Sequence, residues 1–274
     1  MTDLLFGGIA GVISRTITAP FERYKAFRQN FPHIYGKISL LDGIKEMIKK
    51  EGVMSPFKGN GTNCIRIFPD KAIQFYVFEK TKQYLQEKTG VGKNLSYLLA
   101  GSTAGACAYS TVYPLEVIRS KLSIQRTEGI YSGFWQCMRK SVRDRGLRSL
   151  YDGLGVSVAG IIVFYGVNFF TYNYLKDTYN PDKKIALNLL FGSCGGIAAL
   201  STGFPFDTIK RKMHLSGEFG NPKYKGYAHC IKYNLRRFGP ISMYRGIAPA
   251  YIKMIIANPV FFLITDYLKE VRDR

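Results

Sequence analysis

The chain has 274 residues, of which 46% are hydrophobic, and 39 Lys or Arg against 19 Asp or Glu give a formal net charge of +20. That charge is typical of soluble nucleic-acid-binding proteins, but here the basic residues concentrate between long apolar stretches. Apolar stretches of nearly bilayer-crossing length, separated by basic loops, indicate a membrane protein. We therefore expect a membrane-embedded chain with no nucleic acid as a partner.

Six membrane helices are predicted from the apolar stretches, and a shorter amphipathic helix is predicted between the members of each pair. The membrane helices cover approximately 3–28, 62–86, 95–122, 155–178, 186–213 and 247–270. The short helices lie near 39–50, 132–144 and 225–237. The predicted fold class is an all-α membrane protein with six transmembrane helices in three repeats.

The repeats align on three prolines, Pro20, Pro114 and Pro205. Each proline is followed by an apolar residue, an acid, two further residues and a base. Each is preceded by a Gly-xxx-Gly pair, at Gly7/Gly11, Gly101/Gly105 and Gly192/Gly196. In lipid this spacing favours close approach of neighbouring helices. Without a linker between them, the repeats (about 1–92, 93–184 and 185–274) are expected to form a single domain.

The acids and bases of the proline motifs are predicted to pair with each other. A charge inside a bilayer is costly unless it meets an opposite charge or water. Pairs between the acid of one repeat and the base of its neighbour would form a ring that can open and close. The alternative is three ordinary exposed pairs, each within one helix. The residues are Glu22, Lys25, Glu116, Arg119, Asp207 and Lys210.

Three modules of this length with this motif resemble the mitochondrial carrier family. The resemblance implies a barrel of six helices around a central cavity in the mitochondrial inner membrane, with the short helices on the matrix side. It also implies alternating access between two ion-pair networks, the matrix-side one being formed by the proline motifs. The cytoplasmic-side network would comprise Glu79, Lys82, Lys176, Asp266 and Lys269. Asn173 stands where the middle repeat should carry an acid, so this network is expected to form at most two charged pairs.

Substrate residues are sought where the internal symmetry breaks. Equivalent positions hold Arg66, Gly160 and Lys253, and one level of the cavity is expected to present Arg15, Arg66 and Lys253 together. Three cations beside a smooth surface at Gly160 and Ile161 suit a phosphorylated substrate with a flat ring. The alternative is that these bases snorkel or bind lipid phosphate.

The chain is similar to the adenine-nucleotide branch of the family, which includes the ADP/ATP and ATP-Mg/phosphate carriers. This resemblance rests on the three cations and on the stretches 19–23, 59–69 and 155–162. Asp70, one helical turn after Arg66, is expected to share its face and could neutralise it. The departures are Asn173, and Arg145 and Phe238 where the family has an acid before a glycine. They leave open the alternative of a non-transporting structural subunit in a large inner-membrane respiratory complex.

Lipid is a further expected partner, and cardiolipin is the family expectation. Helix N-termini and backbone amides bind phosphate, and aromatic-x-glycine sequences open several helices. The lipid-binding residues are predicted to be Lys58, Gly59, Gly133, Gly226, Arg245 and Gly246, with ordinary helix-capping glycines as the alternative. Five scattered cysteines and three distant histidines indicate neither a disulfide framework nor a metal site. No cofactor and no enzymatic activity are expected.

Overall fold

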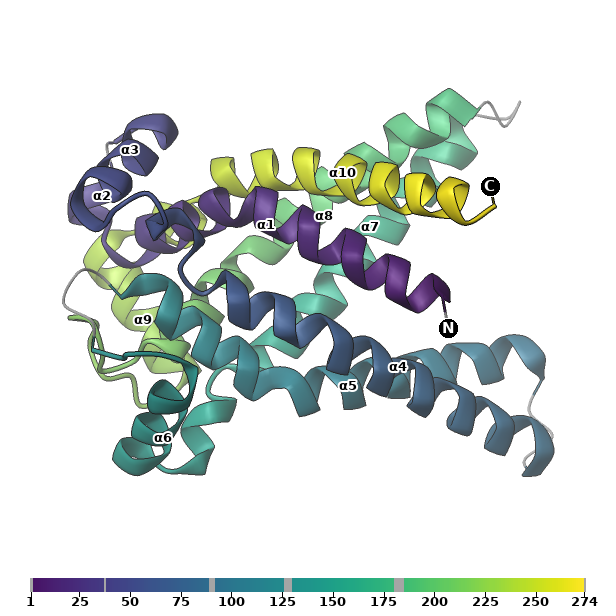
Figure 1. Cartoon of the computed structure of the whole chain (residues 1–274), viewed down its shortest axis with the longest axis horizontal. Helices are drawn as coiled ribbons and strands as arrows, with labels where there is room; N and C mark the ends of the chain where they lie inside the picture. The colour runs from purple at the N-terminus through teal and green to yellow at the C-terminus, as the bar shows by residue number, and fades with distance from the viewer. Residues whose placement is uncertain (1, 37, 89–91, 126–129, 180–184, 274) are drawn as a thin grey trace. The chain divides into compact units, whose positions relative to one another are not determined.

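A computed structural model describes residues 2–36, 38–88, 92–125, 130–179 and 185–273, and it contains only helices and connecting segments in those ranges (Figure 1). The six long helices are α1 (Thr2–Asn30), α4 (Asn60–Lys88), α5 (Lys93–Ile124), α7 (Leu154–Tyr179), α8 (Ile185–His214) and α10 (Ile247–Asp273). The short helices are α3 (Leu40–Glu51), α6 (Phe134–Arg145) and α9 (Tyr227–Phe238). All nine predicted helices are therefore confirmed.

Four short elements were not predicted. They are α2 (Pro32–Tyr35) and the 3₁₀ helices η1 (Ser55–Phe57), η2 (Leu147–Tyr151) and η3 (Pro240–Tyr244). Each 3₁₀ helix follows a short helix and precedes the second long helix of its repeat, which is α4, α7 or α10. A glycine with a left-handed backbone separates it from the short helix, with φ of 86° at Gly52, 74° at Gly146 and 71° at Gly239. Glycine is favoured there because a side chain strains that conformation.

Residue contacts divide the chain into two compact units, whose bounds differ from those of the repeats. One unit comprises residues 1–20, 51–151 and 255–274, and the other comprises residues 21–50 and 152–254. In the first unit α4 packs along α5, and in the second α7 packs along α8. Each of these contacts joins the last long helix of one repeat to the first long helix of the next.

Two stretches among the described residues are long and apolar enough to cross a membrane by length and composition. They are Leu147–Tyr179 and Pro240–Leu268. The other long helices carry the charged motifs and many small residues, which lower their mean hydropathy.

The expected role of the Gly-xxx-Gly pairs is largely wrong. An added Cβ at Gly7, Gly101, Gly105 or Gly192 would meet nothing within 4 Å among the described residues. The tight positions are the neighbouring glycines Gly8 and Gly195, where an added Cβ would lie 2.6 Å from Phe68 Cε1 and from Asn168 Oδ1, respectively. In α1 and α8 the spacing identified the correct part of the helix, but it could not tell which face meets a neighbour.

The short helix of the first repeat packs against α1 through a large residue opposite a glycine. Tyr24 is buried, and an added Cβ at Gly43 would lie 2.2 Å from its Cε2. The Tyr24 hydroxyl donates a hydrogen bond of 2.5 Å to the Ile38 carbonyl. Repeats two and three divide the space differently, because buried isoleucines replace the tyrosine and buried cysteines replace the glycine. These residues are Ile118 with Cys137, and Ile209 with Cys230.

We predict that Gly43→Cys destabilises the protein and that adding Tyr24→Ile restores part of the loss. The single change forces a side chain into the Tyr24 ring, and overpacking of this kind costs about 1–3 kcal/mol. The double variant reproduces the pair found in the other repeats. Thermal unfolding of the purified variants measures both effects. The packing argument fails if the double variant is less stable than Gly43→Cys.

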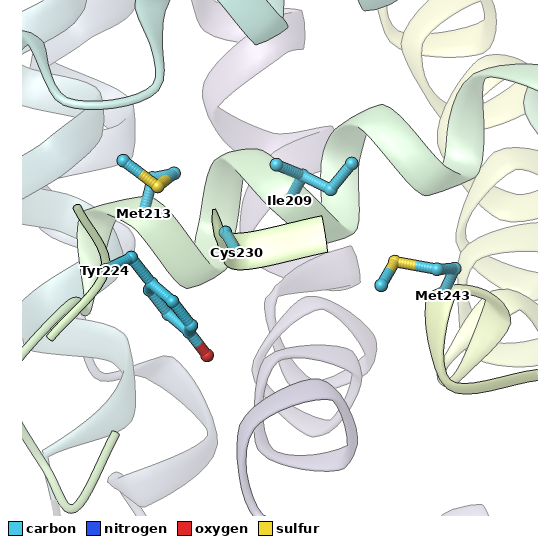
Figure 2. Packing of buried hydrophobic residues seen from close by; sticks show 5 residues of the cluster. All are labelled: Ile209, Met213, Tyr224, Cys230 and Met243. Carbon is cyan, nitrogen blue, oxygen red and sulfur yellow. The ribbon is translucent and has the colours of Figure 1, made fainter. Parts of the chain in front are cut away.

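The corresponding core of the third repeat is shown in Figure 2. Ile209 and Met213 of α8 pack with Tyr224, with Cys230 of α9 and with Met243 of η3. Burial raises the pKa of the Cys230 thiol to about 11 and that of the Tyr224 hydroxyl to about 12. Both groups are therefore neutral over the physiological pH range, as their apolar surroundings require.

Cys230 is predicted to resist alkylation in the folded protein. The thiolate is the reactive form, and at pH 8 a thiol with this pKa is almost entirely protonated. In detergent, a variant that retains only Cys230 should stay unlabelled by a maleimide until it is denatured. A variant that retains only the exposed Cys107 serves as the reactive control. Equal labelling rates in the two folded variants would contradict the burial of this thiol.

Candidate substrate site and charged networks

The acid of the second proline motif lies between two bases. Arg66 Nη1 of α4 lies 3.0 Å from Glu116 Oε2 of α5. Arg119 Nη1, one turn along α5, lies 3.4 Å from the same oxygen. The three side chains are largely buried, with exposed fractions of 14% for Arg66 and 9% for Glu116. One carboxylate therefore contacts two guanidinium groups.

The acid of the first proline motif also contacts two bases. Lys253 Nζ of α10 forms an ion pair with Glu22 Oε2 of α1. Arg211 Nη2 of α8 lies 3.4 Å from Glu22 Oε1. Lys253 and Arg66 occupy equivalent places in their repeats, so the two clusters are built alike.

The third acid joins two repeats. Lys25 Nζ of α1 lies 2.6 Å from Asp207 Oδ2 of α8, which is a pair of the kind predicted between neighbouring repeats. Lys210 Nζ lies 3.6 Å from Asp207 Oδ1. The Lys25 ammonium also lies 4.9 Å from the centre of the Phe204 ring, where a cation–π contact adds to the ion pair.

The same arrangement therefore occurs three times, with each motif acid contacting two bases. Sequence analysis predicted the three acids and five of the six bases, but not which of them meet. Arg211 was missed, although the run Lys210-Arg211-Lys212 at the end of α8 was a signal for it. The expected neutralisation of Arg66 by Asp70 needs correction. Within the described ranges no ion pair joins these two residues, and Glu116 compensates Arg66 instead.

Arg15 of α1 is held by an asparagine of α4. Its Nη1 lies 3.2 Å from the Asn63 carbonyl oxygen and 3.0 Å from Asn63 Oδ1. These contacts orient the guanidinium toward α4. Arg15 thus lies beside α4, the helix that carries Arg66.

The expectation of an open surface at Gly160 needs correction. An added Cβ there would lie 2.8 Å from the Cβ of Phe206, so this glycine admits a side chain of α8. Phe206 immediately precedes Asp207, and Gly160 occupies the place that Arg66 and Lys253 hold in the other repeats. Ile161 is 37% exposed and can still offer an apolar contact.

The charged residues near the C-terminal ends of α4, α7 and α10 are more exposed than those of the proline motifs. Glu79 pairs with Lys82 of its own turn at 3.5 Å, and the Glu79 side chain is 47% exposed. The Lys82 ammonium lies over the rings of Phe78 and Tyr97, and that of Lys176 lies over Tyr172. Asp266 is exposed, and the side chain of Lys269 lies outside the described part of the structure.

A family model described as "Mitochondrial carrier protein" matches the chain three times, over residues 1–89, 91–183 and 181–273. The chain belongs to the mitochondrial carrier family. Its three-repeat, all-helical membrane fold and its location as a multi-pass protein of the mitochondrial inner membrane follow from that membership. Antiporters of the mitochondrial carrier family are transporters. The acids of the three charged clusters belong to the proline motifs of this chain.

Similar mitochondrial carriers include proteins named for adenine nucleotides. The "Mitochondrial adenyl nucleotide antiporter SLC25A24" of Danio rerio is 34% identical over 278 residues, covering 97% of this chain and 57% of that protein. Its Homo sapiens namesake is 30% identical, covering 98% of this chain and 57% of that protein. "Mitochondrial substrate carrier family protein C" of Dictyostelium discoideum is 32% identical, covering 100% and 59%. The chain thus spans little more than half the length of these relatives.

This mitochondrial carrier keeps the predicted lipid-binding glycines at the starts of helices. Gly59 and Gly246 precede α4 and α10 with φ of 83° and 90°. An added Cβ would lie 3.2 Å from the Arg119 carbonyl oxygen at Gly59 and 3.2 Å from the Lys25 carbonyl oxygen at Gly246. Backbone conformation and helix contact thus account for these two glycines. Gly133 and Gly226, which precede α6 and α9, have open space around them.

The unusual residues before Gly146 and Gly239 have counterparts seven positions later. In the first repeat Lys58 Nζ lies 2.7 Å from Glu51 Oε2. The second repeat has Arg145 and Asp152 at these positions, with the signs reversed. The third has Phe238 and Arg245, and the guanidinium lies 5.4 Å from the ring centre. In the second repeat both positions therefore differ in charge from the first, whereas in the third only the acid is replaced.

Proposed function

We propose that this protein exchanges adenine nucleotides, or related phosphorylated metabolites, across the mitochondrial inner membrane by alternating access. The observation that carries the proposal is the double pairing of the motif acids. Arg66 and Lys253 each contact an acid that also contacts a second base. A substrate phosphate can therefore take Arg66 or Lys253 without leaving a buried carboxylate unpaired.

Phosphate is the ligand that best suits such a competition. It accepts charge-assisted hydrogen bonds from arginine and lysine, and its charge exceeds that of the carboxylate it replaces. Binding loosens the link between α4 and α5 at Glu116 and that between α1 and α10 at Glu22. Substrate binding and opening of the matrix-side network thus become one process, in which no covalent bond changes and no enzyme chemistry is needed.

The exposure of the two sets of charges supports a state in which the matrix-side network is formed. The motif acids are largely buried and paired, whereas Glu79 and Asp266 are exposed. In the alternate state these exposures would be exchanged. Asn173 limits the cytoplasmic-side network, so that state should be closed more weakly.

The printed names of the relatives support adenine nucleotides as the substrate class. The Arg15 guanidinium, which donates to Asn63, is suited to a further phosphate. Ile161 offers an apolar contact for a base ring. The comparisons give no support to the alternative of a structural subunit. The altered residues Arg145 and Phe238, which favoured it, have local counterparts in Asp152 and Arg245.

Exchange in proteoliposomes tests the proposal. Vesicles loaded with ATP, ADP, ATP-Mg or phosphate should take up external labelled ADP or ATP, and empty vesicles should not. Uptake that does not depend on an internal counter-substrate would contradict an antiporter. Absence of exchange with every nucleotide, in protein that unfolds cooperatively, would overturn the proposal.

We propose cardiolipin as a structural lipid at the starts of the short helices α6 and α9 and of the long helices α4 and α10. Gly133 and Gly226 support it, because the open space around them leaves the following backbone amides accessible. Arg245 adds a cation, while Lys58 is already compensated by Glu51. Cardiolipin bound there should be retained through purification and detected by mass spectrometry of the lipid extract.

A further inference from the structure

Three cations from different elements surround the ring of Phe238 at the end of α9. The Lys212 ammonium of α8 lies 5.8 Å from the ring centre. The guanidinium groups of Arg237 and Arg245 lie 5.7 Å and 5.4 Å from it. In the described part of the chain none of the three forms an ion pair with a carboxylate. A positive charge of three units therefore gathers around a neutral ring.

In the first repeat the same place holds a carboxylate. Glu51 occupies the position of Phe238, and its side chain is only 4% exposed where it pairs with Lys58. Lys58 occupies the position of Arg245. The third repeat has thus kept the base and lost the acid. It has also gained Lys212 where the first repeat has the apolar Phe27.

Lys212 is the side chain for which this loss matters most. It is 5% exposed, and among the described residues its ammonium has a contact with an aromatic ring but no hydrogen-bond acceptor. In the second repeat the equivalent Lys121 is also buried, but it donates a 2.8 Å hydrogen bond to Ser141. An ammonium with little exposure and no acceptor is unfavourable, and a cation–π contact offsets only part of that cost. A bound anion would supply the compensation that the third repeat lacks.

We propose that an oxyanion of the phosphate type binds between Lys212, Arg237 and Arg245 and replaces the carboxylate that the third repeat lacks. A tetrahedral oxyanion can accept from an ammonium and two guanidinium groups at once, which a single carboxylate cannot do as fully. The phosphate can come from inorganic phosphate or from the headgroup of an anionic lipid. This site uses neither Arg66 nor Lys253, so it is independent of the proposed exchange function.

Thermal unfolding of the detergent-purified chain tests this site. Millimolar inorganic phosphate, compared with chloride at equal ionic strength, should raise the Tm by several degrees, because a ligand of the folded state stabilises it by mass action. Phe238→Glu restores the carboxylate. It should raise the Tm without phosphate and weaken the apparent phosphate affinity roughly tenfold. Ile241→Glu adds the same charge at a position that is 79% exposed and should respond to phosphate as the parent does.

The source of the phosphate is separated by a second titration. Vesicles of cardiolipin in phosphatidylcholine replace inorganic phosphate, and stabilisation by these vesicles alone, lost in Phe238→Glu, identifies a lipid headgroup. A parent that responds to neither ligand overturns the proposal, as does an equal response of Phe238→Glu and Ile241→Glu. If Phe238→Glu does not fold, Lys212→Met takes its place, and a full phosphate response in that variant overturns the site. The variant Arg66→Ala/Lys253→Ala should retain the response, which distinguishes this site from the exchange site.

Discussion

Nucleotide exchange should fall by about 10- to 100-fold in Arg66→Ala and in Lys253→Ala, because each change removes a charge-assisted hydrogen bond worth roughly 1.5–3 kcal/mol. The folded state should survive both changes. In Arg66→Ala, Glu116 still has Arg119 at 3.4 Å, and in Lys253→Ala, Glu22 still has Arg211 at 3.4 Å. The expected signature is therefore a large loss of transport with a small loss of stability.

Initial exchange rates in proteoliposomes, with Tm values of the same preparations, measure this signature. Lys80→Ala is the control, because Lys80 lies on α4 with Arg66 but is exposed. Parental exchange in both Arg66→Ala and Lys253→Ala would show that the substrate site was assigned to the wrong residues. If a variant loses both exchange and its cooperative unfolding transition, the second bases, Arg119 and Arg211, do not hold the acids in place.

Breaking the Lys25–Asp207 pair should have the opposite signature, with a large loss of stability. The side chains of Lys25 and Asp207 are 10% and 27% exposed, and Lys25 Nζ lies 2.6 Å from Asp207 Oδ2. Removing one member of a buried pair typically costs about 3–5 kcal/mol, because the other charge stays buried. Asp207→Ala should therefore lower the Tm strongly, because it leaves the Lys25 ammonium buried without its acid. Lys25→Ala should lower it less, because Asp207 keeps Lys210 at 3.6 Å, and the swap Lys25→Asp/Asp207→Lys should recover part of the Asp207→Ala loss.

An exposed pair gives the matched comparison. Lys50 and Glu46 lie 2.5 Å apart on α3, with the Lys50 side chain 61% exposed. Surface pairs contribute about 0–1 kcal/mol, so Glu46→Ala should leave the Tm almost unchanged. A charge swap at Lys25 and Asp207 that unfolds as readily as the single variants would show that the surroundings, such as Phe204, fix the sign of each charge.

The helices could be predicted from sequence because their signals are local. Apolar length, basic loops and three prolines at nearly equal spacing identified all nine helices. The site could be predicted only in part. Comparing the repeats identified Arg66 and Lys253, but their partners Glu116 and Glu22 depend on how each helix is rotated. The same ignorance of rotation explains the errors at Gly160 and at the Gly-xxx-Gly pairs, since sequence spacing does not say which face of a helix meets a neighbour.

At the end of each short helix, one residue and the residue seven positions later differ in charge from repeat to repeat. These differences limit how the repeats can be recombined. A chimera that joins Glu51 of the first repeat to Asp152 of the second places two acids at positions that are in contact in the first repeat. The reverse chimera places Arg145 opposite Lys58. A segment exchange has to move both members of a pair, although the helices around them are interchangeable in length and order. Each repeat therefore carries its own local charge arrangement, and the apparent threefold symmetry of the helices does not extend to it.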